Sequence, residues 1–368
     1  NKGRLDMNNT SQPAPGCPIG GVSKTAPSEN DSEVVDETSE NIDWAIGPGS
    51  MTWRVLKNPA VFFIGMLRTS MLIPLHPPFA AAAELDTSYL TDPLGRFRRI
   101  AIFAYMAGYG SKEDAIKVSK YVIKSHTMIK GVEPITQKPF QANSEYELAL
   151  TLAVQTFGFL LAYEELYGEL PSKQRDQFIA EQLVLGAVIG VNPDHTPSTY
   201  DSLMSYLADA RQHWAAGLAS RQINAVFVDS DFPSGSLIGD LAWYKRKPIM
   251  WVLRMISDMA LFLMNPEERL LIGINRAPKL RWKFAVRASF HLLAKYMASK
   301  KGIAFFTDFV GTKVGGIFLR AFKVENPTNV AALESKYTVP DPKSVFCELP
   351  DLVRNWPGSP AEYKLGQG

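Results

Sequence analysis

A histidine- or cysteine-based metal site in this chain must draw on few residues, because the sequence holds only five histidines and two cysteines. Cys17 and Cys347 lie near opposite ends, which argues against a disulfide scaffold and a cysteine-rich zinc or iron–sulfur site. No glycine-rich phosphate loop, GxSxG elbow or HExxH motif occurs in the sequence. Most nucleotide-binding and hydrolase functions are thereby excluded, and the histidines remain.

His126 has the most informative position among them. Ala115, Ser119, Val122 and His126 recur at spacings of four, three and four, which places His126 on the inward stripe of a predicted helix. An inward histidine without a nearby acid or second histidine suits a single axial ligand of a heme iron. The alternative is a core histidine bonded to a backbone carbonyl, and the spacing alone favours that alternative.

Arg96 and Arg99 form a second candidate site at the start of another predicted helix. They are three residues apart and share a face, whereas Arg98 points elsewhere. Inward guanidinium groups need anionic partners, which heme propionates or a polarised oxygen ligand would supply. Two arginines near a helix N-terminus also oppose the helix dipole, which weakly favours a specific role over a solvated basic helix start.

The elements that must position these residues are almost all helices. Apolar residues recur three and four apart from Trp44 onward, and only 224–228 has weak strand character. Ser111 and Asp114 have the spacing of a capping box, and Gly168 follows the longest helical stretch. The predicted helices are 60–72, 94–107, 112–129, 145–167, 172–189, 198–215, 248–264, 266–273, 277–299 and 304–322.

The sequence therefore predicts a mostly α protein with one large helical domain over residues 43–323. Residues 1–42 combine seven acidic and three basic residues with little apolar content, which predicts a disordered acidic tail. Residues 324–368 contain six prolines and little periodicity, so we expect an irregular C-terminal wrap.

The net charge of +2 hides a strongly basic segment. Residues 276–320 hold ten basic residues against one acid, Asp308, and aromatic residues are interleaved among them. Nucleic acid, an anionic membrane surface and heme propionates would each fit this charge. No nucleic-acid module is recognisable, so we expect peripheral membrane contact through 276–320, with a solvated helix face as the alternative.

The N-terminus lacks the apolar stretch of a signal peptide. The longest apolar run, 248–264, is shorter than the roughly 20 residues needed to span a bilayer, and Arg254 and Asp258 interrupt it. We therefore expect a buried or surface-lying helix there, and a cytoplasmic protein that is at most peripheral to a membrane.

Several short motifs of one protein family occur in this sequence in the family's order and spacing. Asp92 to Arg99 (DPLGRFRR) is similar to the family's DPxxRxxRT segment, and His126 to Gly131 (HTMIKG) is similar to its HxxVxG segment. Through these motifs the segment from Trp53 to about Tyr206 resembles the MpaB-type oxygenases and the latex-clearing rubber oxygenases. Further matching pieces are Asn58-Pro59, Gly65 to Arg68, His76-Pro77, Ala80 to Ala82, Tyr109 to Ser111, Ala162 to Gly168, Gly190-Val191 and Thr196 to Thr199.

This resemblance implies a helical domain with a globin-like core that binds heme b. His126 would be the proximal iron ligand, and Arg96 and Arg99 would be catalytic residues that line the distal side or bind the propionates. The implied activity is an oxygenase that uses O2 or peroxide on a small apolar substrate. Its reaction would be oxidative cleavage of a carbon–carbon double bond in a prenyl or polyketide-like chain.

Three departures from the family pattern bear on the substrate. Ile100 replaces the usual threonine, the residues from Leu150 to Leu152 replace a WVH segment, and Arg99 stands where the rubber oxygenases carry lysine. Arginine stays protonated and cannot ligate iron, so a lysine-closed resting state is not expected. These changes argue against polyisoprene and for a smaller apolar molecule.

Two other functions remain open on these residues. One is a non-catalytic helical protein that binds a hydrophobic ligand at a membrane, and the other is a peroxidase-type or dehydrogenase-type heme enzyme. We expect the remaining histidines to have minor roles: His76 structural, His195 exposed in a loop, His213 packed at a helix end and His291 on the basic helix.

Overall fold

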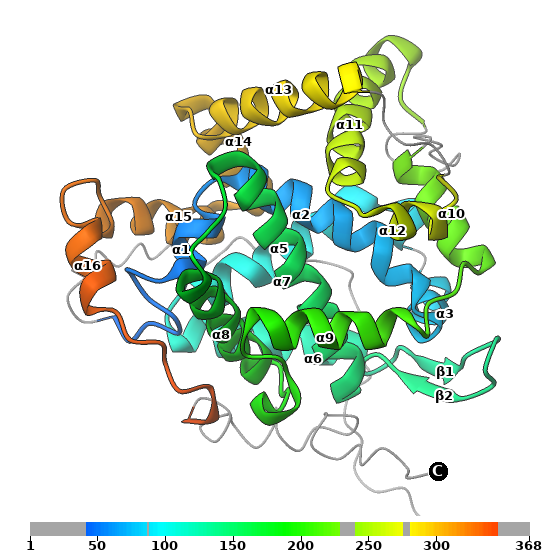
Figure 1. Cartoon of the computed structure of the whole chain (residues 1–368), viewed down its shortest axis with the longest axis horizontal. Coiled ribbons are helices and arrows are strands. Elements are labelled where there is room, and N and C mark those ends of the chain that lie inside the picture. Colours follow the sequence, from blue (N-terminus) through cyan, green and yellow to red (C-terminus); the bar gives the residue numbers. More distant parts are fainter. Residues whose placement is uncertain (1–41, 87, 229–239, 275–279, 345–368) are drawn as a thin grey trace, which may run out of the picture. The chain divides into compact units, whose positions relative to one another are not determined.

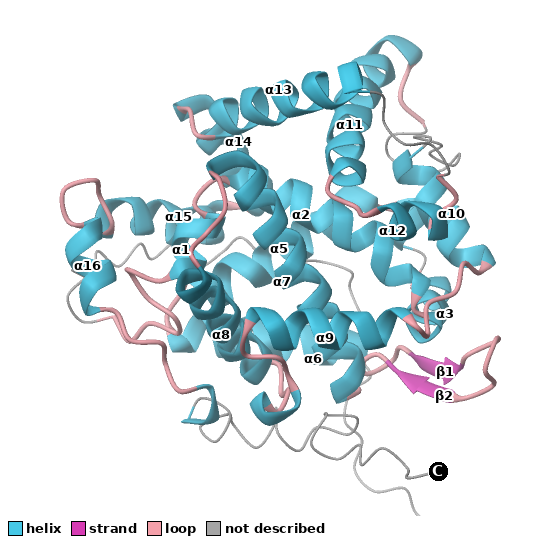
Figure 2. Cartoon of the chain, in the orientation of Figure 1, coloured by secondary structure: helices cyan, strands magenta, loops and turns pink. Residues whose placement is uncertain are grey.

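A computed structural model of the chain describes residues 42–86, 88–228, 240–274 and 280–344 (Figure 1). The predicted acidic tail, apart from residue 42, lies outside these residues, as do 345–368 and the start of the basic segment. Within the described part, helices dominate and one small sheet is present (Figure 2). The prediction of a mostly α protein is confirmed.

The first half of the chain builds the centre of the molecule. Its elements are α1 (Met51–Leu56), α2 (Pro59–Leu72), η2 (Ile73–Leu75), α3 (Pro77–Leu85), α4 (Ser88–Thr91), α5 (Pro93–Tyr109), α6 (Lys112–His126), β1 (Lys130–Val132), β2 (Pro139–Gln141), α7 (Glu145–Tyr167) and α8 (Ser172–Val188). The second half adds η3 (Pro193–His195), α9 (Tyr200–Arg211), α10 (Leu218–Val228), α11 (Trp243–Phe262), α12 (Pro266–Leu271), α13 (Leu280–Met297), α14 (Lys300–Val310), α15 (Thr312–Val324) and α16 (Val330–Lys336).

Local capping explains where the helices of the site begin. Ser111 accepts a hydrogen bond from the Asp114 amide, and the Asp114 carboxylate accepts one from the Ser111 amide, so the predicted capping box starts α6. Asp92 accepts from the Gly95 amide at 2.9 Å and starts α5. The predicted helix 145–167 has the observed bounds of α7, between its N-cap Ser144 and Gly168.

Two sequence predictions about elements are wrong. Residues 224–228 are helical and belong to α10, because Ala219, Ile223, Val226 and Phe227 bury one helical face. The predicted helix 304–322 is broken at Gly311, whose φ of +89° separates α14 from α15. In addition, the antiparallel pair β1–β2 forms where no strand was expected, and the short helix α16 lies within the expected C-terminal wrap.

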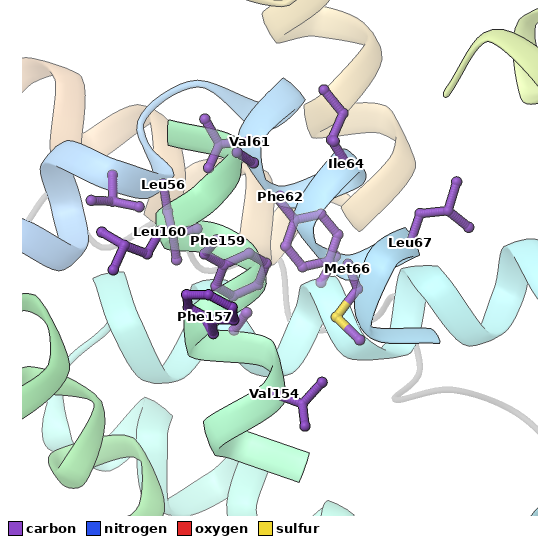
Figure 3. Close-up of a cluster of buried hydrophobic side chains, with 14 of the residues drawn as sticks. Leu56, Val61, Phe62, Ile64, Met66, Leu67, Val154, Phe157, Phe159 and Leu160 are labelled. Atoms are coloured by element: carbon purple, nitrogen blue, oxygen red, sulfur yellow. The ribbon is translucent and has the colours of Figure 1, made fainter. Parts of the chain in front are cut away.

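Helices α2 and α7 cross at the centre of the core. A Cβ atom added to Gly158 would lie 2.6 Å from the carbonyl oxygen of Gly65, so the two backbones approach at a pair of glycines. Around the crossing, Phe62 of α2 faces Phe159 of α7 with ring centroids 5.8 Å apart (Figure 3). Such close packing holds the central helices in one arrangement.

By length and apolarity, α7 could cross a membrane, as could α2 to α3 taken as one bent pair. In the structure α7 is a core helix, because 78% of its apolar window is buried inside the protein. The described residues contain no other candidate span. Buried core helices pass the same test of length and apolarity, so these two candidates do not by themselves indicate a membrane span.

A buried ion cluster fastens α12 and α9 to this core. Arg68 of α2 donates to both carboxylate oxygens of Glu268 at 2.6 and 2.7 Å, and Arg211 of α9 donates to one of them at 3.0 Å. Arg68 and Glu268 are each 1% exposed. The carboxylate is therefore fully paired, which is what a buried charge requires.

Candidate functional site

Helices α5 and α6 form an antiparallel hairpin through the short turn at Gly110 and Ser111. His126 ends α6 and Arg96 lies in the first turn of α5, about equally far from the turn along each helix. The hairpin therefore brings the two residues level with each other, close enough for the Arg96 charge to act on the His126 imidazole. The fold therefore brings these two sequence-predicted residues close together.

Arg96 is held from two sides. Its Nη1 donates to Oδ2 of Asp86 at 2.8 Å, and its guanidinium lies 3.5 Å from the centroid of the buried Tyr89 ring. A carboxylate and an aromatic face are the two partners that a guanidinium stacks and bonds with most effectively. The Arg96 guanidinium is consequently oriented, with about a fifth of the side chain exposed.

The His126 imidazole is poised as a neutral base. Its side chain is partly buried, and its Nδ1 is buried without a hydrogen-bond partner. Burial lowers the pKa of His126 to about 4, and the positive charge of Arg96 contributes to this shift while Asp86 opposes it. The imidazole is therefore neutral near pH 7, which is the form that binds a metal.

Asn143 lies next to His126 and completes this part of the site. Its amide donates to the carbonyl of Ile123 at 2.9 Å, which anchors the side chain to the last turn of α6. Its Oδ1 and Nδ1 of His126 are both buried, and no well-formed hydrogen bond reaches either atom from the described residues. A side-chain hydrogen bond with Asn143 nevertheless acts on the pKa of His126 and raises it, so the two groups lie within reach of each other.

The structure separates Arg99 from Arg96, although both lie on the same face of α5. Arg99 bonds to Asp92, the N-cap of its own helix, at 3.3 Å, and its side chain is 40% exposed. Arg98 points elsewhere, as expected, because its Nη2 lies against Gly311 between α14 and α15. Of the three arginines, Arg96 is the one whose charge acts on His126.

An apolar cluster continues the site into the protein. Phe103 lies two turns after Arg96 on α5, and Val122 lies one turn before His126 on α6. Both pack against four buried residues of α7 and of the segment that begins at the end of α8: Leu148, Ala149, Ile189 and Val191. Leu150 and Leu152, where the family pattern has WVH, are buried in the core. The site therefore has one polar end and one apolar wall.

The donor set bears on which metal group could bind. Among the described residues, no group of three or more histidine, cysteine, aspartate or glutamate side chains is placed to hold a metal ion. A porphyrin supplies four of the ligands of its iron itself, so one histidine is enough to attach it. A neutral histidine beside a cation and an apolar wall fits a heme with anionic propionates.

The other histidines have ordinary positions. His76 is buried, and its Nε2 lies 2.9 Å from a carboxylate oxygen of Glu147, which agrees with the expected structural role. His195 is exposed and pairs with Glu145 at 2.6 Å. His213 is exposed, so the prediction that it packs at the helix end is wrong, and the neighbouring Trp214 is buried there instead. His291 is exposed on α13.

Sequence reasoning missed three residues of the site. They are Asp86, Tyr89 and Asn143, none of which belongs to a motif in the sequence. Asp86 and Tyr89 lie ten and seven residues before Arg96, so the fold of α4 decides whether they meet it. Asn143 lies beyond the β1–β2 hairpin, which returns the chain to the end of α6.

A separate apolar cleft lies on another face of α5. It is bounded by Phe63 and Leu67 of α2, Pro93, Leu94 and Phe97 of α5, Val226 and Phe227 of α10, Leu253, Ile256 and Ser257 of α11 and Phe309 of α14. Ser257, its polar member, donates its hydroxyl to the carbonyl of Phe227 at 2.6 Å. The cleft therefore offers an apolar ligand a surface with almost no free polar group.

Comparison with known proteins gave one result. The family model described as "ER-bound oxygenase mpaB/B'/Rubber oxygenase, catalytic domain" matches residues 53–297, which extend from α1 to the end of α13 and include Arg96, Arg99 and His126. No curated protein and no solved structure was found to match the chain.

Proposed function

The chain belongs to the mpaB and rubber oxygenase catalytic-domain family, and from that premise we propose that it is a heme-dependent oxygenase with His126 as the proximal ligand of a heme b iron. The family makes it an oxidoreductase of the oxygenase type. The observation that carries the heme assignment is the pairing of a neutral His126, with a buried unsatisfied nitrogen, and the oriented Arg96.

The residues of the chain would divide the work as follows. His126 binds the iron through Nε2, while an Nδ1–H turned to Oδ1 of Asn143 would satisfy both buried atoms and orient the ring. Arg96 binds a propionate or stabilises negative charge that develops on the oxygen substrate. Bound heme would supply the iron at which O2 or peroxide is activated.

Asp86 and the apolar wall support these roles. Asp86 holds the Arg96 guanidinium by a charge-assisted hydrogen bond, so its donors are already directed before a ligand arrives. The cluster of Phe103 and Val122 excludes water from the inner side of the site. Arg99, which is partly exposed and bonded to Asp92, would act at the entrance to the site.

The substrate that we propose is a small apolar chain of prenyl or polyketide type, cleaved oxidatively at a carbon–carbon double bond. The apolar cleft beside α5 supports this choice, because its lining is almost entirely hydrophobic and suits an apolar chain. Its position on a different face from Arg96 also favours a second candidate function, a hydrophobic-ligand protein without redox chemistry.

An absorption spectrum separates these two functions. The full chain is purified after growth with ample heme, and we expect a Soret band that disappears in His126→Ala and persists in His213→Ala, which changes an exposed histidine. Absence of the band from the unsubstituted protein would refute the heme assignment and favour the ligand-binding function. A band that persists in His126→Ala would mean that another residue is the ligand.

A further inference from the structure

We propose that the first half of α11 and the outer side of α13 form a face that docks on an anionic phospholipid bilayer. This α11–α13 face is defined by large exposed side chains on both helices: Trp243, Tyr244, Ile249, Trp251 and Val252 of α11 and Phe284, Leu292 and Tyr296 of α13. The two helices contact each other, and their N-terminal ends lie at the same side of the structure (Figure 1).

Helix α11 changes character halfway along its length. From Ser257 on, its inward residues are buried in the core, with Met259 and Ala260 fully enclosed. Before that point, Trp243 and Trp251 are 69% and 68% exposed. Isolated exposed apolar residues are ordinary, but a cluster of several aromatic residues marks an interaction site.

The charge of the same face identifies the partner. Residues 241–257, which lie between Asp240 and Asp258, hold four basic residues and no acid. Residues 280–301 hold six basic residues and no acid, and among these six Arg287 pairs with Glu165 of α7. Lys247 and Lys245 lie 4.9 and 6.0 Å from the ring centroids of Trp243 and Tyr244. Amphipathic aromatic rings with cations beside them suit the headgroup region of an anionic membrane.

This charge also argues against the other occupants of such a surface. A second copy docked face to face would bring the same basic residues together, and like charges oppose that contact. Nucleic acid would use the cations but would not require so many exposed apolar side chains on one face. A bilayer with anionic headgroups accommodates both the cations and the apolar residues.

An apolar stripe links this face to the cleft beside α5. Ile249 and Val252 are exposed, and Leu253 and Ile256, which follow on the same side of α11, line the cleft. An apolar molecule that leaves the bilayer at this face would meet a continuous apolar path into the cleft. This path is relevant to catalysis only if the proposed function holds, whereas the docking face does not depend on it.

The test is co-sedimentation of the full chain with phosphatidylcholine vesicles, with and without phosphatidylserine, at low and high salt. We expect binding that requires phosphatidylserine and weakens with salt. The paired change Lys245→Glu with Lys247→Glu, and separately Trp243→Ala with Trp251→Ala, should each reduce binding by at least about tenfold. The matched controls are Lys117→Glu with Lys120→Glu and Tyr121→Ala, which alter exposed residues of α6 and should leave binding unchanged.

Circular dichroism verifies that each variant is folded whether or not heme is bound, so loss of binding is not confused with unfolding or with failure of the heme assignment. Binding without preference for the anionic lipid, or equal loss in the α6 controls, would overturn the proposal. So would an absence of vesicle binding together with a dimer, detected by sedimentation equilibrium, that the α11 variants dissociate; that outcome would assign the face to a second copy.

Discussion

Two clusters of charged residues in this protein are built in opposite ways. In the Arg68–Glu268–Arg211 cluster, Arg68 and Glu268 are buried and the carboxylate accepts hydrogen bonds from both arginines. In the Arg96–Asp86–His126 site, the arginine is oriented but no well-formed hydrogen bond reaches the buried histidine nitrogen from the described residues. The first arrangement holds one carboxylate between two cations, whereas the second leaves a neutral histidine beside an oriented cation, which is typical of residues that await a ligand.

The largest expected effect on stability comes from removing the carboxylate of the Arg68–Glu268–Arg211 cluster. Glu268→Gln keeps the shape of the side chain but leaves Arg68 and Arg211 without their anion. Because an uncompensated charge then remains buried, we expect the free energy of unfolding to fall by about 3–5 kcal/mol. Urea unfolding monitored by circular dichroism measures this loss.

The neighbouring residue supplies the control. Glu267 is exposed, so Glu267→Gln should change stability by no more than about 0.5 kcal/mol. If both variants lost equally little unfolding free energy, the Arg68–Glu268–Arg211 cluster would not stabilise the fold. The contrast with the Arg96–Asp86–His126 site would then be wrong.

Glu181 is an intermediate case, a buried acid that is satisfied by hydrogen bonds but has no cation. It accepts from the amides of Met51 and Thr52 at 3.0 and 2.6 Å at the start of α1. Burial nevertheless raises its pKa to about 7, above the value of 4.5 expected in the unfolded chain. The folded protein therefore binds more protons between these values, and stability should decrease as pH rises from about 4.5 to about 7.

Glu181→Gln should remove this component of the pH dependence, which amounts to at most about 1.4 kcal/mol per pH unit. The measurement is urea unfolding across this pH range for both proteins. Parallel stability curves for the two proteins would show that the Glu181 carboxylate is ionised in the folded state throughout.

His76 and His126 allow a paired and an unpaired group to be compared within one residue type. His76 is paired with Glu147, so His76→Ala should cost about 1–3 kcal/mol of unfolding free energy by leaving a carboxylate without its partner. Within the described residues His126 has no such ion pair, so His126→Ala should cost the heme-free protein less than His76→Ala. Thermal unfolding of the heme-free variants checks the order, and a reversed order would assign His126 a structural role.

The sequence was sufficient for helices with strong local signals and insufficient where long-range packing decides. Ser144 and Gly168 mark the ends of α7, and both ends were predicted correctly. The segment 224–228 was misassigned because β-branched residues resemble a strand, yet its neighbours bury a helical face against the core. The β1–β2 pair was missed because strands of three residues carry almost no periodic signal.

The same limit applies to the site. Arg96, Arg99 and His126 were predicted from motifs, but motif spacing treated the two arginines alike. Their difference arises from partners: Asp86 and Tyr89 hold Arg96 beside His126, and Asp92 holds Arg99 at the surface. Whether Asp86 reaches Arg96 depends on the path of the chain through α4, which residue types alone do not determine.

The smallest and most specific effect distinguishes these two arginines. Arg96 lowers the pKa of His126 by its charge, in addition to the larger effect of burial, whereas Arg99 is solvent-screened and paired with Asp92. Arg96→Gln should therefore raise the pKa of His126 from its value of about 4, and Arg99→Gln should leave it unchanged. Titration of the heme-free protein by NMR, with the His126 ring resonances assigned through His126→Ala, measures both. An equal pKa shift in the two variants would show that the arginines act alike on His126, as their spacing suggests. If neither variant shifted the pKa of His126, the charge of Arg96 would not act on this histidine.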